Sequence, residues 1–160
     1  MLSITYNVKI ITPVIMGGAD SKQLDQIRPT EIKGMMRYWF RSIIGSTLKD
    51  DIEELQRIEN MFFGSTDIRS PFKLIVNPIN LNIGEFKRES SKYLGFSFNF
   101  KKQYKNETVK VILPESSFEV NFLFFQTKNL KNVIKAAVLP FYISTALGGF
   151  GLRSRRGFGN

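Results

Sequence analysis

The sequence predicts a single α+β domain of the ferredoxin-like (RRM-like) class, in which helices cover one face of an antiparallel sheet. Two observations predict this class. Segments in which polar and apolar residues alternate, as in half-buried strands, stand before and after a segment with the apolar spacing of a helix. The resulting order of strand, helix, strands and helix is the skeleton of that fold. With 160 residues, 42% of them hydrophobic, the chain can bury a core of its own.

The predicted strands are segments in which every second residue is apolar. Residues 3–11 alternate in this way from Ile4 to Ile10, and Pro13 ends the pattern. The polar stretch at 80–92 is expected to be a loop. The other predicted strands are residues 72–76, 96–100, 109–113 and 118–124.

The clearest helix is predicted at residues 29–44. Pro29 suits a first helical position, and Glu31 complements the positive end of a helix. Gly45 is typical of a helix end. Apolar residues recur three and four positions apart and form the expected inward face, which comprises Ile32, Met35, Met36, Trp39, Phe40, Ile43 and Ile44.

Two more helices are predicted. Residues 50–62 combine an acidic cluster, expected to face solvent, with apolar residues expected to face inward. Residues 129–146 share an apolar face, and Pro140 is expected to kink that helix. The expected inward residues of the 50–62 helix are Ile52, Leu55, Ile58 and Phe62.

The predicted fold lacks its last strand. A ferredoxin-like domain needs a strand after its last helix, whereas Phe158, Gly159 and Asn160 are what remains here to begin one. We therefore expect residues 1–160 to form one domain that is incomplete at its C-terminus. Three explanations stay open: the chain is a fragment, the strand comes from elsewhere, or the fold differs.

The charge of the chain favours a polyanionic partner. Twenty-three Lys and Arg residues against fourteen Asp and Glu residues give a net charge of +9. The acidic side chains concentrate in residues 50–59, so the rest of the chain is cationic. Nucleic acid is the commonest biological polyanion, although a basic protein without such a partner is an alternative.

Cysteine and histidine are both absent. This excludes a disulfide framework, thiolate or imidazole metal ligands, and histidine as a general base or proton shuttle. We expect no cofactor and no metal. Residues 1–11 do not resemble a signal peptide and no apolar run could span a bilayer, so we expect a cytoplasmic protein without a membrane partner.

The glycine-rich segment 148–159 is the sharpest feature of the sequence. Its glycines, among them Gly149, Gly151 and Gly157, permit close backbone approach and positive φ, and free N–H groups can cradle phosphate oxygens. Its arginines carry fork-shaped donors that match phosphate; they are Arg153, Arg155 and Arg156.

A disordered basic tail is the alternative interpretation of this segment. Phe150, Leu152 and Phe158 argue against it, because they are apolar anchors that a disordered tail does not need. The segment is neither a dinucleotide fingerprint, since it follows a helix rather than a strand, nor a P-loop, since it lacks the Gly-Lys-Ser/Thr ending.

Three segments together resemble a known family. The sequence Gly-Gly-Phe-Gly-Leu-Arg-Ser-Arg-Arg-Gly-Phe-Gly at 148–159 resembles the glycine-rich loop of the RAMP superfamily of CRISPR effector subunits. Thr12-Pro13-Val14-Ile15-Met16-Gly17-Gly18-Ala19 resembles the segment after the first strand of those proteins. Residues 27–41 and 62–65 are similar to the signature of one branch, the first subunit of the type III-B (Cmr) effector complex.

The resemblance implies a noncatalytic subunit that helps hold guide (CRISPR) RNA and target RNA, with other Cmr effector subunits as partners. Members of this branch usually carry two RAMP-like domains, and this chain is about half that length. The candidate RNA-binding residues outside the glycine-rich segment are Gly17, Gly18, Arg28, Arg37 and Arg41.

Each candidate has a structural alternative. If they do not bind RNA, Gly17 and Gly18 form an ordinary turn. In the same case, Arg37 and Arg41 form a cationic helix edge that bonds to solvent and to the acidic 50–62 helix. Lys33, on the same edge, is interpreted in this second way.

Two other functions stay open. A RAMP-family endoribonuclease would use a loop acid such as Asp20 or Asp25, although no paired carboxylate cluster supports it. A protein-only scaffold would make contacts through the sheet edge that the missing strand leaves open.

Overall fold

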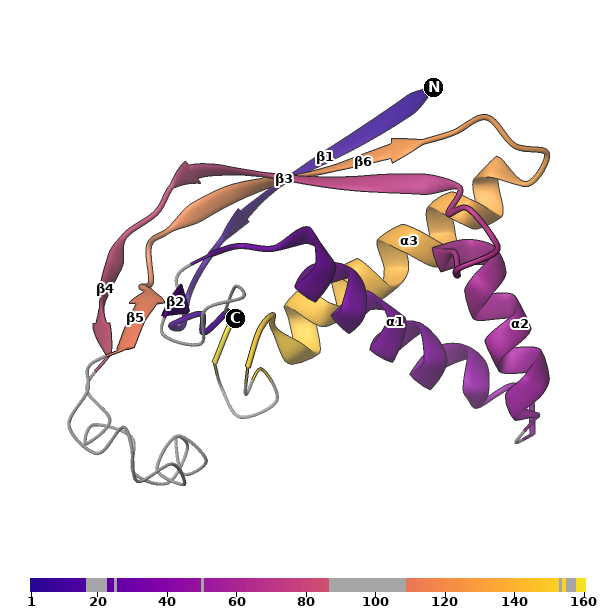
Figure 1. The fold of residues 1–160 in the computed structure, drawn as a ribbon, viewed down its shortest axis with the longest axis horizontal. Helices are drawn as coiled ribbons and strands as arrows, with labels where there is room; N and C mark the ends of the chain where they lie inside the picture. Colours follow the sequence, from indigo (N-terminus) through magenta and orange to yellow (C-terminus); the bar gives the residue numbers. More distant parts are fainter. Residues whose placement is uncertain (17–22, 25, 50, 87–108, 153, 155–157) are drawn as a thin grey trace.

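The computed structural model describes residues 1–16, 23–24, 26–49, 51–86, 109–152, 154 and 158–160. Its main sheet is antiparallel, in the order β1-β6-β3, so the last of these strands in sequence lies between the other two (Figure 1). Leu2 pairs with Phe124 at one end and Lys9 with Ser117 at the other. The bounds of the strands are β1 Leu2–Lys9, β3 Phe72–Asn80 and β6 Ser117–Phe124.

Three helices lie on one side of this sheet (Figure 1). Helix α1 spans Pro29–Gly45, with Pro29 in its first turn, and matches the prediction at both ends. Helix α2 spans Ile52–Phe63, and the Asp51 side chain caps it by accepting a hydrogen bond from the Glu54 N–H at 2.9 Å. Helix α3 spans Leu130–Ile143. No helix in the described part of the chain is long and apolar enough to cross a membrane.

The centre of the core is strand β6, whose residues are alternately buried and half-buried. Its inward side chains pack against buried residues of α1 and α3, because a strand between two others presents one whole face to the helices. The inward residues of β6 are Phe118, Val120, Phe122 and Phe124, and those of the two helices are Ile32, Met36, Phe40, Val133, Ala137 and Phe141.

The helix α2 differs from its predicted orientation. Ile52, expected inward, is 75% exposed, and Phe63 is buried in its place. Glu59, part of the cluster expected to face solvent, is 6% exposed. The reason is register: Leu55, Ile58, Glu59 and Phe62 recur at helical spacing, so the inward stripe includes the carboxylate.

A second sheet was not predicted. It has the order β2-β5-β4 and comprises β2 (Gln23–Leu24), β4 (Ile83–Phe86) and β5 (Val109–Ile112). The predicted loop at 80–92 is therefore wrong over 83–86, where pairing with β5 stabilises a short strand that has little pattern of its own. The predicted strand 96–100 lies outside the described residues.

The winding of the chain changes after α3, which contains Pro140 and so lacks one backbone N–H. The helix continues to Ile143 and then forms a π-helical turn at Ser144–Gly148, η4. The Ser144 hydroxyl donates to the Pro140 carbonyl at 2.6 Å. The kink expected at Pro140 stays a prediction, and the irregularity that the structure shows is this widened turn, which begins four residues later and leads into the glycine-rich segment.

Candidate nucleic-acid interface

The described glycines of the 148–159 segment have backbone geometry that excludes side chains. Gly149 has φ 109° and Gly151 has φ 90°, both in the left-handed region. A Cβ at Gly151 would lie 2.6 Å from the carbonyl oxygen of Ile15, and one at Gly149 would lie 2.6 Å from that of Gly159. These glycines therefore let the segment pack against other backbone of the same protein.

The two described ends of this segment are anchored in the fold. Phe150 and Phe158 are each 4% exposed, whereas Leu152 is 50% exposed and is not an anchor. The Leu152 N–H donates to the Ile15 carbonyl at 2.8 Å, and the Gly159 N–H donates to the Pro13 carbonyl at 2.9 Å. Both ends of the segment are therefore held by the short stretch 13–15.

Several sequence-predicted residues lie outside the described part of the chain. They are Gly17, Gly18, Arg153, Arg155, Arg156 and Gly157. Their role in RNA binding stays a prediction. The described residues next to them, Met16 and Leu152, lie close together because Ile15 and Leu152 share a hydrogen bond.

Arg28 lies at the start of α1, beside the same stretch of chain. It is half-buried, and its backbone N–H donates to the Met16 sulfur at 3.0 Å. A shallow hollow of about 300 Å³ joins the first half of α1 to the glycine-rich segment. The structure thus brings Arg28 and Gly151 to one region; the residues that line the hollow are Thr30, Glu31, Gly34, Met35, Tyr38 and Gly151.

Arg37 and Arg41 are engaged by α2 instead. Arg37 Nη1 donates to Glu59 Oε1 at 2.7 Å, and its Nη2 donates to the Gly64 carbonyl at 2.6 Å. Arg41 Nη1 contacts both carboxylate oxygens of Glu59 at 3.2 Å. Through Glu59 the two guanidiniums join α1 to α2, which is the structural alternative that the sequence left open. Whether either also binds RNA stays a prediction.

Lys33 lies one turn before Arg37 on the same edge of α1, with its ammonium over the aromatic ring of Phe72 at 5.0 Å from the ring centroid. Burial lowers the pKa of Lys33, and the nearby charge of Arg37 lowers it further. The surroundings therefore stabilise the positive charge of the Lys33 ammonium less than water would. Sequence reasoning placed Lys33 on a solvated helix edge and missed this environment.

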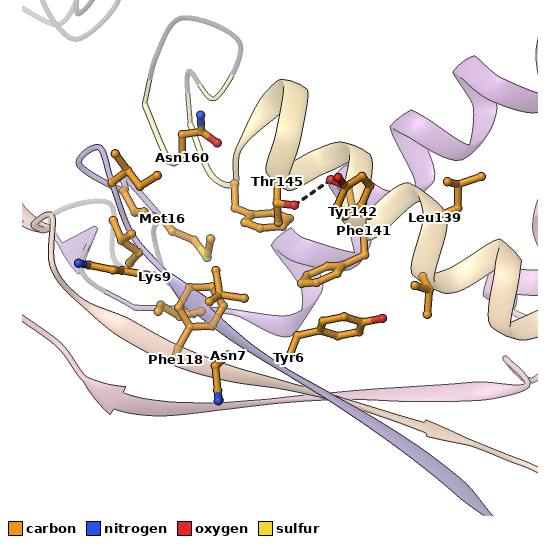
Figure 2. A pocket seen from close by; sticks show the side chains of 18 of the residues that line it. Tyr6, Asn7, Lys9, Met16, Phe118, Leu139, Phe141, Tyr142, Thr145 and Asn160 are labelled. Atoms are coloured by element: carbon orange, nitrogen blue, oxygen red, sulfur yellow. Dashed lines mark hydrogen bonds between the residues drawn. The ribbon is translucent and has the colours of Figure 1, made fainter.

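A larger groove lies between β1 and α3 (Figure 2). It has a volume of about 820 Å³, and its lining is mostly apolar. The rings of Tyr6 and Phe141 meet there at 5.4 Å between centroids, and the hydroxyl of Thr145 donates to the Tyr142 carbonyl at 2.8 Å. An apolar groove suits a polypeptide better than a polyanion.

Across the described residues, no three acidic, histidine or cysteine side chains come together in a way that could hold a metal ion. Asp20 and Asp25, the loop acids of the endoribonuclease alternative, lie outside the described residues.

A known protein family matches most of the chain. A sequence model of the RAMP superfamily matches residues 7–160. The chain belongs to the RAMP superfamily. The resemblance predicted from the motifs is confirmed, and with it the ferredoxin-like α+β class.

Two curated relatives come from Pyrococcus furiosus. The CRISPR system Cmr subunit Cmr1-1 is 35% identical over 159 residues, which cover 97% of this chain and 46% of that protein. The Cmr subunit Cmr1-2 is 27% identical over 177 residues, which cover the whole of this chain and 94% of that protein. The chain thus spans about half the length of the first relative.

Solved structures have the same RAMP fold. The crystal structure of Cmr1 from Pyrococcus furiosus, in its apo form, superposes with a TM-score of 0.76 at 31% identity, over 99% of this chain and 48% of that one. A chain of the type III-B Cmr-beta complex bound to cognate target RNA superposes with a TM-score of 0.66 at 18% identity, over 97% and 52% of the two chains. This second likeness shows the fold alone.

Proposed function

We propose that this RAMP protein is a noncatalytic RNA-binding subunit of a type III-B (Cmr) CRISPR effector complex. It helps hold guide RNA and target RNA, and other Cmr subunits are its protein partners. The observation that carries the proposal is the packing of the glycine-rich segment against residues 13–15, beside the start of α1, in a chain of net charge +9.

The comparisons support this proposal in two ways. The curated relatives are named as Cmr subunits, and one complex of similar fold was solved with target RNA bound. The electrostatics agree, because a polyanion gains from a cationic surface through the release of condensed counterions. In this proposal Arg153, Arg155 and Arg156 bind phosphates, while Arg28, Arg37 and Arg41 add positive potential.

The test is RNA binding by the chain, followed by fluorescence anisotropy with labelled single-stranded RNA across a salt series. Affinity should fall steeply with salt and show little sequence preference. Replacing Arg153, Arg155 and Arg156 together by Ala should weaken binding at least about ten-fold, because each charge-assisted phosphate bond contributes roughly 1.5–3 kcal/mol before compensation by solvent.

A Lys-substituted version of the same three sites is the matched control. It should recover part of the affinity, since the charge is retained and the bidentate fork is lost. Binding that is unchanged in the Ala variant, or affinity that does not depend on salt, would contradict the proposal.

The noncatalytic part of the proposal rests on the absence of His and Cys from the sequence. Labelled RNA incubated with the chain should stay intact with or without divalent metal. Metal-dependent fragments that disappear in Asp20→Ala or Asp25→Ala would favour the endoribonuclease alternative.

A second role, protein contact at the edge of β1, is favoured by the apolar groove. In the described residues β1 pairs with a strand on one side, β6. Past the end of β1, the Ile11 and Thr12 N–H groups donate to the Asn160 carbonyl at 2.6 and 2.7 Å. The backbone at Gly159–Asn160 therefore runs antiparallel to residues 11–13 and points along the open edge.

We infer that the occupant of this groove is an extended polypeptide strand that continues from Asn160, antiparallel to β1, and completes one RAMP domain. A designed six-residue extension of alternating Val and Thr should raise the melting temperature by about 3–8 °C and slow amide exchange in β1. A Gly-Ser extension of equal length is the control. Equal melting temperatures for both would contradict this role.

A further inference from the structure

A pocket at the other edge of the main sheet, beside β3, combines positive charge with an accessible depression. It has a volume of about 380 Å³ and lies between the first turns of α1, the segment before β3, and β3 itself. Its described lining includes three cations from these three elements, Lys33, Arg69 and Lys73, and no acidic residue. The pocket is distinct from the glycine-rich segment, and the sequence did not single out Arg69 or Lys73.

The cations of this pocket are not neutralised within the protein. Across the part of the chain that the structure describes, none of the three forms an ion pair. Two of them lie over aromatic rings: Lys33 over Phe72, and Arg69 over Phe125 at 4.8 Å. Such rings hold a cation in place without cancelling its charge, so the donors remain available to an anion.

Two further features of the pocket favour an anion with oxygen acceptors. Ser70 lines it, and the Ser70 hydroxyl oxygen, itself shielded from solvent, has no hydrogen-bond partner among the described residues, although a buried hydroxyl normally has one. The start of α1 borders it, and no side chain caps that helix, so its positive end faces the same space. The lowered pKa of Lys33 fits an ammonium whose compensating charge would come from a ligand.

The pocket is continuous with the candidate interface. Thr30 lines both this pocket and the shallow hollow that reaches Gly151. A backbone that leaves the glycine-rich segment and crosses the first turn of α1 therefore meets Lys33 next and then Arg69. Within the pocket, cations that come from three separate elements suit a chain of phosphates better than a single small anion.

We propose that this basic pocket binds phosphates of the RNA backbone and extends the RNA path past the start of α1 to the edge of β3. This proposal rests on the RNA-binding function proposed above. It adds Lys33, Arg69 and Lys73 as phosphate contacts.

The experiment compares two charge-matched variants of the chain in the anisotropy assay over a salt series. One is Lys33→Gln, Arg69→Gln, Lys73→Gln; the other is Lys49→Gln, Lys110→Gln, Lys131→Gln, three exposed lysines that line neither depression. For single-stranded RNA each neutralised phosphate contributes about 0.7 to the slope of log affinity against log salt. The pocket variant should therefore lose roughly 2 units of slope, and the control variant should keep the wild-type slope.

The outcomes separate this proposal from the one it rests on. Wild-type protein that does not bind RNA overturns both. Wild-type binding with equal slopes in the two variants overturns the pocket alone, and a remaining loss in the Arg153, Arg155 and Arg156 variant then preserves the function. Displacement of RNA by poly-glutamate as readily as by unlabelled RNA overturns the assignment to phosphate. If the triple variant melts early, Arg69→Gln, at an exposed position, carries the same test with a loss of about 0.7 in slope.

Discussion

The two edges of the β1-β6-β3 sheet differ in chemistry although one set of helices covers both. Beside β1 lies an apolar groove of about 820 Å³, and the backbone of Gly159–Asn160 leads toward it. Beside β3 lies a pocket of about 380 Å³ that three cations line. A half-open ferredoxin-like sheet can therefore offer a polypeptide one edge and a polyanion the other, and the side chains that helices, strands and connecting segments place around each edge set the difference.

The largest expected effect is a loss of folding stability when a ring beside the apolar groove is removed. Phe141 is buried and its ring lies 5.3 Å from that of Phe122 and 5.8 Å from that of Phe150. Phe141→Ala should lower the free energy of unfolding by about 3–5 kcal/mol. Phe125→Ala on the basic side should cost about 1 kcal/mol, because that ring is half-buried beneath Arg69. Urea unfolding of both variants measures the difference, and equal losses would mean that the two edges are equally apolar.

The second prediction tests whether Arg37 and Arg41, the α1 cations that face α2, also contribute to RNA binding. The Glu59 side chain is 8% exposed and pairs with both Arg37 and Arg41. Glu59→Gln removes the negative charge that the two arginines share. Because both arginines are partly exposed, the loss of stability should be about 1–3 kcal/mol. RNA affinity, measured well below the melting temperature, should stay unchanged if the two arginines are structural. A clear gain in affinity would instead show that Glu59 withholds them from RNA.

The smallest effect concerns Lys33. Its pKa in the folded state is lowered from 10.5, so the folded protein binds this proton less tightly than the unfolded chain does. The charge therefore destabilises the fold at neutral pH, and stability rises as pH increases toward 10.5. Lys33→Met should leave the melting temperature within about 2 °C of wild type or raise it, and should remove this pH dependence while weakening RNA binding. A marked fall in melting temperature would mean that the ammonium over Phe72 is mainly structural.

Local periodicity explains which parts of the fold the sequence predicts. Helix α1 and strands β1 and β6 follow from residues that are near neighbours in the chain, so pattern alone places them within one or two residues. Strand β4 exists through pairing with β5, which lies more than twenty residues away, and its own four residues carry little pattern.

The same distinction applies to the site. The glycine-rich segment is continuous in sequence, and its composition and spacing single it out. The basic pocket joins Lys33, Arg69 and Lys73, which become neighbours through folding, so no linear motif marks it. The prediction for Glu59 is wrong because an acidic side chain is expected to face solvent. Its helical spacing from Leu55 and Phe62 nevertheless puts it on the inward stripe.

The anchoring of the glycine-rich segment has a consequence for the entropy of binding. The Leu152 N–H and the Gly159 N–H are both held by carbonyls of one short stretch, those of Ile15 and Pro13. Folding has therefore already fixed the separation of these two anchor points. A ligand that binds beside them does not lose the conformational entropy of bringing them together. Gly159→Ala, which would force a Cβ against the Phe150 backbone, should thus weaken RNA binding without removing a single positive charge.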